Sequence, residues 1–207
     1  MAIKDLANVK GFKTTEGSPL YSERVARKDD QMVARLRAAG ALFIGKTNTP
    51  EFGLGSNTFN PVYGKTKNPY DLTKTCGGSS GGAAVALATR MLSISDGSDM
   101  MGSLRNPAAW NNVYGLRPTW GLVPPEPSGE IFLSQLSTLG PMARSPKDLA
   151  LLLDVQANHF DNKSYVSQSK SFSNFTAQPR MKGIKIGWLG DWGLSLIHIS
   201  EPTRQDS

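Results

Sequence analysis

Residues 77–82 place two adjacent serines between two pairs of glycines, in the order Gly-Gly-Ser-Ser-Gly-Gly. Glycine has no Cβ, so this segment can adopt tight turns and close approaches that other residues cannot. A long polar stretch rich in Asn, Gly and Pro, residues 47–71, precedes it, and an alanine-rich stretch, residues 82–90, follows it. Loops of that length in a compact domain are usually functional. The sequence therefore predicts a tight functional loop that leads into a closely packed helix.

Hydrophobic patterns and capping residues predict helices that alternate with short strands. Ser145, Pro146 and Asp148 combine an N-cap residue, a proline at the first helical position and an acid in the first turn. This alternation is typical of an α/β fold. We expect helices at 29–39 and 82–90 and from residue 145 onward, strands at 2–6, 41–44, 91–94 and 182–189, and loops at 47–71 and 158–178.

Composition excludes several classes of protein. The 207 residues, 39% hydrophobic and 19% charged, are typical of one globular domain. The net charge is +6, but Lys and Arg are spread along the chain rather than clustered with aromatic residues, which argues against a nucleic-acid partner. A single cysteine, Cys76, excludes an internal disulfide and is typical of a reducing compartment, so we expect a cytoplasmic protein. No apolar run approaches about 18 residues, so no membrane span is expected.

Ser79 and Ser103 are candidate nucleophiles, each next to glycine, and they lie 103 − 79 = 24 residues apart. A serine hydroxyl needs a neighbouring base before it becomes a good nucleophile. The two histidines, His159 and His198, lie in a polar segment and in the C-terminal tail, so a Ser-His-Asp triad is poorly supported. A lysine can be the base if burial lowers its pKa. Lys4, in a short apolar strand, is the candidate.

Three motifs make the region from residue 3 to about residue 154 resemble the amidase signature family. They are Ile3-Lys4-Asp5, the Gly-Gly-Ser-Ser-Gly-Gly segment, and residues 99–105 (Asp-Met-Met-Gly-Ser-Leu-Arg). The resemblance implies a three-layer α/β/α fold with a mixed sheet, which this chain contains only in part. It implies hydrolysis of a linear amide in a small molecule, with no cofactor and no metal.

The resemblance also implies a Ser–Ser–Lys triad and an acyl-enzyme mechanism. Lys4 matches the catalytic lysine, Ser79 the bridging serine that follows a cis peptide bond, and Ser103 the nucleophile. The implied oxyanion hole consists of backbone N–H groups of Met100, Met101, Gly102 and Ser103. The family commonly has glycine where this chain has Met101. The residues that we expect to support the site without taking part in chemistry are Gly77, Gly78, Ser80, Asp99 and Arg105.

Both ends of the chain look non-native. Residues 194–207 resemble a translated sequencing-library adapter, so we interpret residues 1–193 as the N-terminal part of an amidase signature domain and leave 194–207 out of the fold. The family is usually more than twice this length, which suggests an internal fragment. We expect such a fragment to be poorly active or unstable alone, because an unfinished sheet exposes edges and apolar faces.

Other interpretations stay open. The double-glycine loop is also typical of an anion-binding nest at a helix N-terminus, although the lysine of a P-loop is absent. Within the family, the alternative to a stand-alone amidase is the amidotransferase component that works with a partner on misacylated tRNA, and Met100-Met101 favours the stand-alone enzyme. A non-catalytic fragment is the third hypothesis. The amide cleaved and the oligomeric state, a homo-oligomer included, are not predicted.

Overall fold

Two short parallel strands carry the N-terminal lysine into the interior. In the computed structural model, residues 1–126, 135–157, 171–174, 183 and 185 are described. Strand β1 (Ala2–Lys4) is buried along its length and pairs in parallel with β2 (Gly45–Thr47), with Lys4 opposite Thr47. The strand is shorter than the predicted 2–6, because the chain turns where the N–H of Ala7 bonds the carbonyl of Lys4.

A second sheet is antiparallel and has three strands in the order β5-β7-β6. Strand β5 (Ile94–Asp99) pairs with β7 (Thr138–Ala143), which also pairs with β6 (Tyr114–Gly115). A small hairpin of β3 (Phe59–Asn60) and β4 (Gly64–Lys65) lies within the predicted loop 47–71. Parallel and antiparallel pairing therefore both occur, as the predicted mixed α/β class requires.

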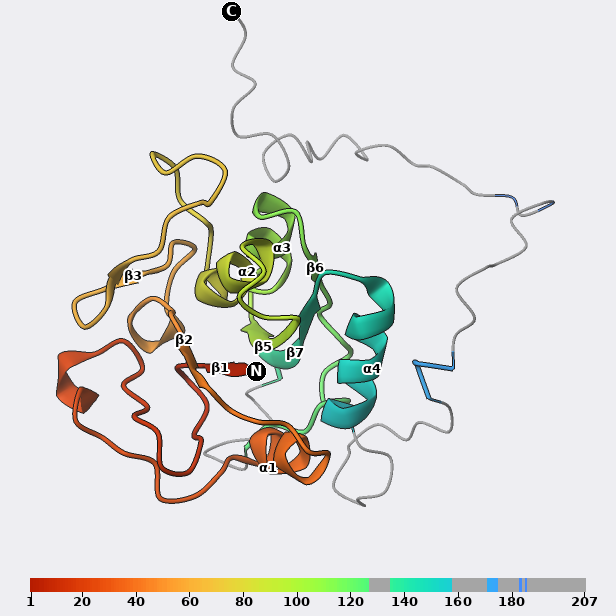
Figure 1. Cartoon of the computed structure of the whole chain (residues 1–207), viewed down its shortest axis with the longest axis horizontal. Coiled ribbons are helices and arrows are strands. Elements are labelled where there is room, and N and C mark those ends of the chain that lie inside the picture. The colour runs from red at the N-terminus through yellow and green to blue at the C-terminus, as the bar shows by residue number, and fades with distance from the viewer. Residues whose placement is uncertain (127–134, 158–170, 175–182, 184, 186–207) are drawn as a thin grey trace, which may run out of the picture. The chain divides into compact units, whose positions relative to one another are not determined.

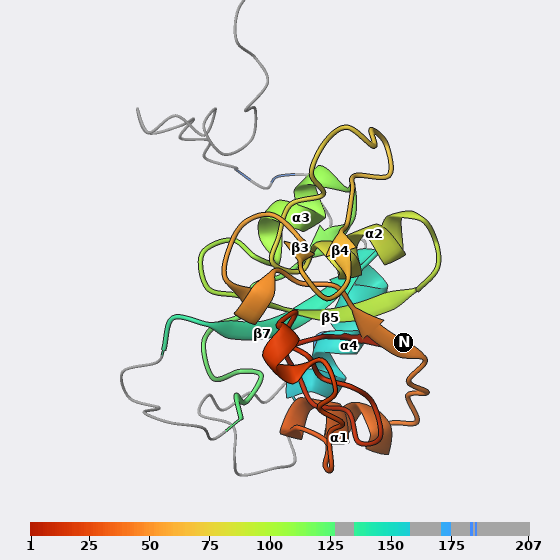
Figure 2. The same ribbon diagram turned by 90° about the vertical axis from the view of Figure 1, so that its left-hand side faces the viewer.

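Helices cover both faces of these strands. The α-helices in the described residues are α1 (Gln31–Ala38), α2 (Gly81–Ala88), α3 (Arg105–Trp110) and α4 (Pro146–Ala157), and 3-10 turns span Pro19–Tyr21 and Glu51–Gly53. In Figure 1 the labelled α-helices lie around β5 and β7. Figure 2 shows α2 and α3 on one side of these strands and α1 and α4 on the other. This arrangement is the layered α/β/α order that the sequence predicts.

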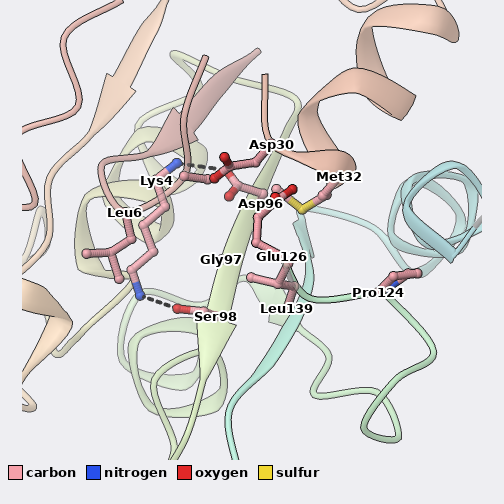
Figure 3. A pocket seen from close by; sticks show the side chains of 11 residues that line it. Lys4, Leu6, Asp30, Met32, Asp96, Gly97, Ser98, Pro124, Glu126 and Leu139 are labelled. Atoms are coloured by element: carbon pink, nitrogen blue, oxygen red, sulfur yellow. Dashed lines mark hydrogen bonds between the residues drawn. The ribbon is translucent and has the colours of Figure 1, made fainter. Parts of the chain in front are cut away.

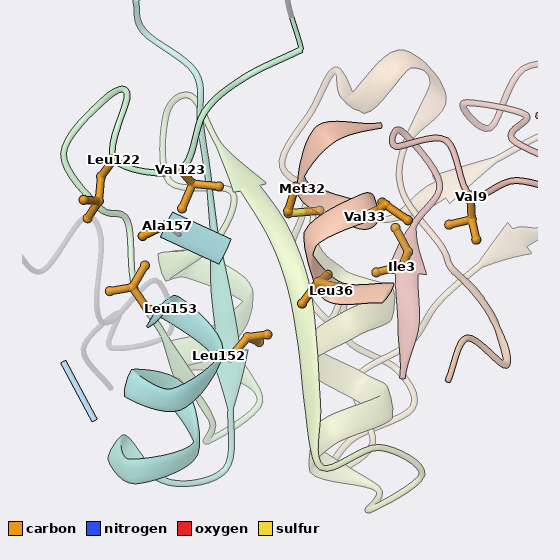
Figure 4. Packing of buried hydrophobic residues seen from close by; sticks show 10 residues of the cluster. All are labelled: Ile3, Val9, Met32, Val33, Leu36, Leu122, Val123, Leu152, Leu153 and Ala157. Carbon is orange, nitrogen blue, oxygen red and sulfur yellow. The ribbon is translucent and has the colours of Figure 1, made fainter. Parts of the chain in front are cut away.

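Two hydrophobic clusters hold the layers together. The larger joins α1 and α4 with β1, as Figure 4 shows; its buried residues are Ile3, Val9, Met32, Val33, Leu36, Leu122, Val123, Leu152, Leu153 and Ala157. The second packs the alanines and Leu87 of α2 against Leu104, Ala108 and Met142. A Cβ at Gly82 would collide with the backbone of Asn48, so glycine is needed where this helix begins.

The predicted helices are confirmed, with ends that differ by a few residues. Helix α4 begins as expected: Ser145 Oγ accepts a hydrogen bond from the N–H of Asp148 (3.1 Å) and donates one to its carboxylate (2.7 Å). Helix α1 differs in its cap, because the carboxylate of Asp30 accepts hydrogen bonds from Asn8 instead of from N–H groups of the helix.

Two predicted strands are wrong. Residues 41–44 are not a strand; Leu42 and Ile44 are 81% and 69% exposed, and the strand that pairs with β1 begins at Gly45. Of the predicted strand 91–94, residues 91–93 precede β5, which starts at Ile94 and continues through polar residues. Hydrophobicity misplaced both strands because the paired residues of β2 and β5 are mostly polar residues and glycine. The predicted strand 182–189, most of the predicted loop 158–178 and all of 194–207 lie outside the described residues.

The chain divides into two units, residues 1–175 and residues 176–207. All elements named above belong to the first. None of the helices in the described part of the chain has the length and apolar character that crossing a bilayer requires.

Candidate active site

The amine of Lys4 lies inside the protein among three serine hydroxyls. Its Nζ is 2.6 Å from Ser79 Oγ, 3.0 Å from Ser80 Oγ and 3.0 Å from Ser98 Oγ. Lys4 is only 1% exposed. No carboxylate oxygen lies within ion-pair distance of this amine among the described residues. A buried lysine with only hydroxyl partners is held in place without a counter-ion at contact.

Burial lowers the pKa of Lys4 from 10.5 to about 7, even though the negative charges of Asp96 and Asp99 act in the opposite direction. Removing a charged amine from water destabilises its protonated form, and hydroxyl groups compensate only in part. At neutral pH a large fraction of Lys4 is therefore uncharged. An uncharged amine can accept a proton from the hydroxyl of Ser79, which it contacts.

Separate elements bring these residues together. Lys4 comes from β1, Ser98 from β5, and Ser79 and Ser80 from the loop that precedes α2. The Gly78–Ser79 peptide bond is cis, as the resemblance implies. The carbonyl of Gly77 accepts hydrogen bonds from the N–H (3.1 Å) and hydroxyl (2.8 Å) of Thr58.

Ser103 reaches the same loop through its backbone. Its carbonyl accepts a hydrogen bond from the N–H of Ser80 (3.1 Å), and Ser103 lies in the turn between β5 and α3. The structure thus places the predicted nucleophile beside the pair of serines that hold the lysine amine. The amine of Lys4 contacts the hydroxyl groups of Ser79 and Ser80, whereas Ser103 joins this loop through its carbonyl.

Asp99 fixes the turn that carries Ser103. Its carboxylate accepts hydrogen bonds from the N–H groups of Gly102 (2.8 Å) and Leu104 (3.0 Å) and from two guanidinium nitrogens of Arg105 (both 3.0 Å). Burial alone would raise the pKa of Asp99, but these donors outweigh it and lower the pKa to about 2. Because the N–H of Gly102 already donates to Asp99, we propose that the oxyanion-hole donors are the backbone N–H groups of Met100, Met101 and Ser103.

Sequence reasoning missed two polar residues on β5. Ser98 contacts the amine of Lys4, and Asp96 accepts a hydrogen bond from the backbone N–H of Lys4 (2.9 Å). They stand two residues apart, so both project from one face of the strand. That period of two was available in the sequence, but the strand was predicted in the wrong place.

A second lysine, Lys46, is partly buried nearby and has different partners. Lys46 Nζ is 3.5 Å from Asp5 Oδ1 and donates hydrogen bonds to the carbonyl of Ala7 (2.5 Å) and to Thr14 Oγ1 (3.1 Å). Burial lowers the pKa of Lys46, and the charge of Asp5 opposes this effect. Asp5 in turn accepts hydrogen bonds from the backbone and hydroxyl of Thr15. This cluster ties the loop after β1 to β2.

Cys76 is buried, and burial raises the pKa of its thiol to about 11. The thiolate needed for nucleophilic attack is therefore scarce at neutral pH. Among the described residues, no cluster of three or more His, Cys, Asp or Glu side chains is arranged to hold a metal ion.

The family model described as Amidase matches residues 1–202. The chain belongs to the amidase signature family. It is 49% identical over 158 residues to a glutamyl-tRNA(Gln) amidotransferase subunit from Thermus thermophilus, a match that covers 76% of this chain and 33% of that protein. Like other members of the family, it has an α/β fold.

Two solved structures of family members support the fold. A 6-aminohexanoate cyclic dimer hydrolase in complex with its substrate superposes with a TM-score of 0.77 at 34% identity, over 84% of this chain and 37% of that one. The native peptide amidase of Stenotrophomonas maltophilia has a TM-score of 0.73 at 36% identity, over 83% and 36%. The chain spans between about a third and two fifths of the length of these relatives.

Proposed function

We propose that the protein hydrolyses the carbon–nitrogen bond of a small linear amide through an acyl-enzyme on Ser103. The observation that carries the proposal is the 2.6 Å contact between Lys4 Nζ and Ser79 Oγ, made by a buried amine whose pKa is lowered to about 7. A lysine with a pKa near the working pH is well suited to general-base catalysis. Membership of the amidase signature family supports the same reaction class.

In the first half of the reaction, neutral Lys4 takes the proton of Ser79 while Ser79 takes the proton of Ser103. Ser103 Oγ then forms a bond to the amide carbonyl carbon, and the carbonyl π electrons move to its oxygen. Backbone N–H groups in the turn that Asp99 fixes stabilise this oxyanion. Because these donors belong to a rigid turn, they need little rearrangement when charge develops.

In the second half, Ser79 returns a proton to the leaving nitrogen and the carbon–nitrogen bond breaks. The amine leaves, and a water molecule attacks the ester on Ser103 with the same lysine–serine pair as base. The acid product leaves, and Ser103 recovers its proton. Each proton transfer in this scheme runs through Ser79, which explains why one serine contacts the lysine and the other occupies the turn.

Active-site labelling tests the proposal directly. The protein at its full natural length, its Ser103→Ala variant and its Cys76→Ala variant are treated with a fluorophosphonate and weighed by intact-mass spectrometry. We expect one adduct on the parent and on Cys76→Ala, and none on Ser103→Ala. An adduct that survives in Ser103→Ala, or a folded parent that forms none, contradicts the proposal. The same reaction on residues 1–207 alone tests whether this segment is sufficient.

A second candidate function rests on the 49% identity to a glutamyl-tRNA(Gln) amidotransferase subunit. In this case the same acyl-enzyme chemistry would act on glutamine and deliver ammonia to a partner that holds tRNA. Glutamine hydrolysis that increases strongly when charged tRNA and partner proteins are added favours this function. Hydrolysis of simple linear amides by the protein alone, with little activity on glutamine, favours the stand-alone amidase.

A further inference from the structure

Strand β5 holds Lys4 at both ends of the residue. Asp96 Oδ1 accepts a hydrogen bond from the backbone N–H of Lys4 (2.9 Å), and Ser98 Oγ accepts one from the side-chain amine (3.0 Å). Figure 3 shows the side chain of Lys4 running beside the strand from Asp96 to Ser98. Two residues of a strand advance about 6.8 Å, which is close to the reach of an extended lysine side chain. The spacing of the two acceptors therefore matches the length of the residue that they hold.

Burial of the Asp96 carboxyl group is destabilising unless partners offset it. It is 1% exposed, and burial raises the pKa of its carboxyl to about 6. It borders a cavity of about 150 Å³ together with Lys4, and the carboxyl groups of Asp30 and Glu126 line the same cavity. Two cations favour the ionised form of Asp96, namely Lys4 from β1 and Lys46 from β2. A buried acid is strongly destabilising unless it has partners such as these.

The charge of Asp96 also acts on the lysine amine. No ion pair links Asp96 to the amine. The charges of Asp96 and Asp99 both raise the pKa of Lys4, and Asp96 has the larger effect. Asp99 is already neutralised by Arg105, at 3.0 Å. Asp96 therefore combines a fixed contact to the lysine backbone with a charge that acts on the lysine amine and that no ion pair among the described residues neutralises.

We propose that Asp96 is a positioning residue for Lys4: its carboxylate anchors the lysine backbone so that the amine reaches the serines, and its charge limits how readily the amine gives up its proton. This inference rests on the proposed function, because it concerns the base of that reaction. It assigns to a buried acid of β5 a role that the triad alone does not contain.

Direct titration of the Lys4 amine tests the effect of the Asp96 charge. The protein at full natural length is labelled with ¹³C-lysine, and the Lys4 ε-carbon signal is assigned by its absence in Lys4→Met. We expect a midpoint of about 7 in the parent. Asp96→Asn keeps an acceptor for the Lys4 N–H but removes the charge, so the midpoint should fall by roughly one unit. An unchanged midpoint in Asp96→Asn overturns the charge role.

Kinetics test the anchoring role. Asp96→Leu loses both the charge and the acceptor, so its kcat should fall at least about tenfold below that of Asp96→Asn with little change in KM, since a displaced base slows chemistry more than binding. In Asp96→Asn the acid limb of the kcat/KM profile should move to lower pH with the titration. Equal kcat values for the two variants overturn the anchoring role.

Ser95→Ala is the matched control. Ser95 is the neighbouring residue of β5, and its hydroxyl donates to the carbonyl of Ala2 in β1 (3.2 Å), so the variant removes a buried β1–β5 hydrogen bond without touching Lys4 or any charge. We expect its Lys4 midpoint and acid limb to equal those of the parent. Failure of the proposed function looks different: activity would persist in Ser103→Ala or Lys4→Met, whatever Asp96 does to the titration.

Discussion

Lys4 and Lys46 stand on adjacent parallel strands, the first buried and the second partly buried, and their surroundings differ in kind. The pairing of Ile3 with Lys46 and of Lys4 with Thr47 puts the two lysines on opposite faces of the β1–β2 pair. Three serine hydroxyls surround the amine of Lys4, whereas Lys46 lies 3.5 Å from the carboxylate of Asp5.

Under the proposed function, this difference separates a lysine suited to proton transfer from one that supports the structure. Hydroxyl groups satisfy an amine in either protonation state, because each can donate or accept a hydrogen bond. A carboxylate at contact favours only the cation. Lys4 can therefore exchange a proton in the proposed reaction, while Lys46 holds a loop against a strand through its contacts with Asp5, Ala7 and Thr14.

The largest effect in this comparison is expected on activity. Lys4→Met should reduce kcat/KM by roughly 10³-fold, within the range that general-base catalysis contributes. Lys46→Met, the matched control on the other strand, should keep an activity close to that of the parent once correctly folded protein is counted. Steady-state hydrolysis of a chromogenic amide measures both. Equal losses in the two variants would remove the distinction between the lysines.

The next largest effect is expected on stability, for substitution of Lys46. Lys46→Met leaves the buried carboxylate of Asp5 without its cation, which should lower the free energy of unfolding by about 3 kcal/mol. Asp5→Asn combined with Lys46→Met should recover part of that loss. Urea unfolding followed by circular dichroism measures the four proteins of this cycle. If the double variant loses the sum of the single losses, Asp5 and Lys46 do not interact.

The pH dependence gives a smaller effect with a definite sign. Activity needs neutral Lys4, so kcat/KM should rise about tenfold per pH unit below about 7 and level off above it. Folded Lys4 binds fewer protons than the unfolded chain between about 7 and 10.5, so stability should increase with pH across this window. Lys4→Met should show a flatter stability curve there. A rate that is constant from pH 5 to 8 would contradict the assignment of Lys4 as base.

The smallest effect is expected for Ser98→Ala. This variant removes one of three hydroxyl contacts to the amine and leaves Ser79 in place, so kcat should fall by roughly threefold, the size of one ordinary hydrogen bond. Ser79→Ala serves as the comparison and should lose far more, because Ser79 carries protons in the proposed reaction. Similar losses in both variants would mean that the three hydroxyls only hold the lysine.

The site residues could be predicted because their motifs are local. Lys4, Ser79 and Ser103 each lie in a short recognisable segment, and the glycines around Ser79 pointed to a tight loop. The contact between Lys4 and Ser79 crosses 75 residues, and the resemblance supplied it where periodicity could not. Ser145 and Pro146 located α4 correctly for the same local reason.

The missed features depend on tertiary structure. Strand β5 consists largely of buried Ser, Asp and Gly residues, so neither apolar alternation nor an apolar run marks it. Its acids and serines become favourable only once β1, the loop before α2 and the turn before α3 supply hydrogen-bond partners. Gly102 shows the same limit: its N–H was expected to face an oxyanion, but the carboxylate of Asp99 engages it.

The turn held by Asp99 has a consequence for how the protein can diverge. Its frame consists of hydrogen bonds that Asp99 accepts from backbone N–H groups and from Arg105, with Arg117 at 3.8 Å from the same carboxylate. None of these bonds uses the side chains of Met100 and Met101, which are 45% and 82% exposed. Mutations at these two positions can accumulate without loosening the frame around Ser103. The exposed side chains of this turn and the hydrogen bonds that hold it thus belong to separate groups, so a lineage can change the first while it keeps the second.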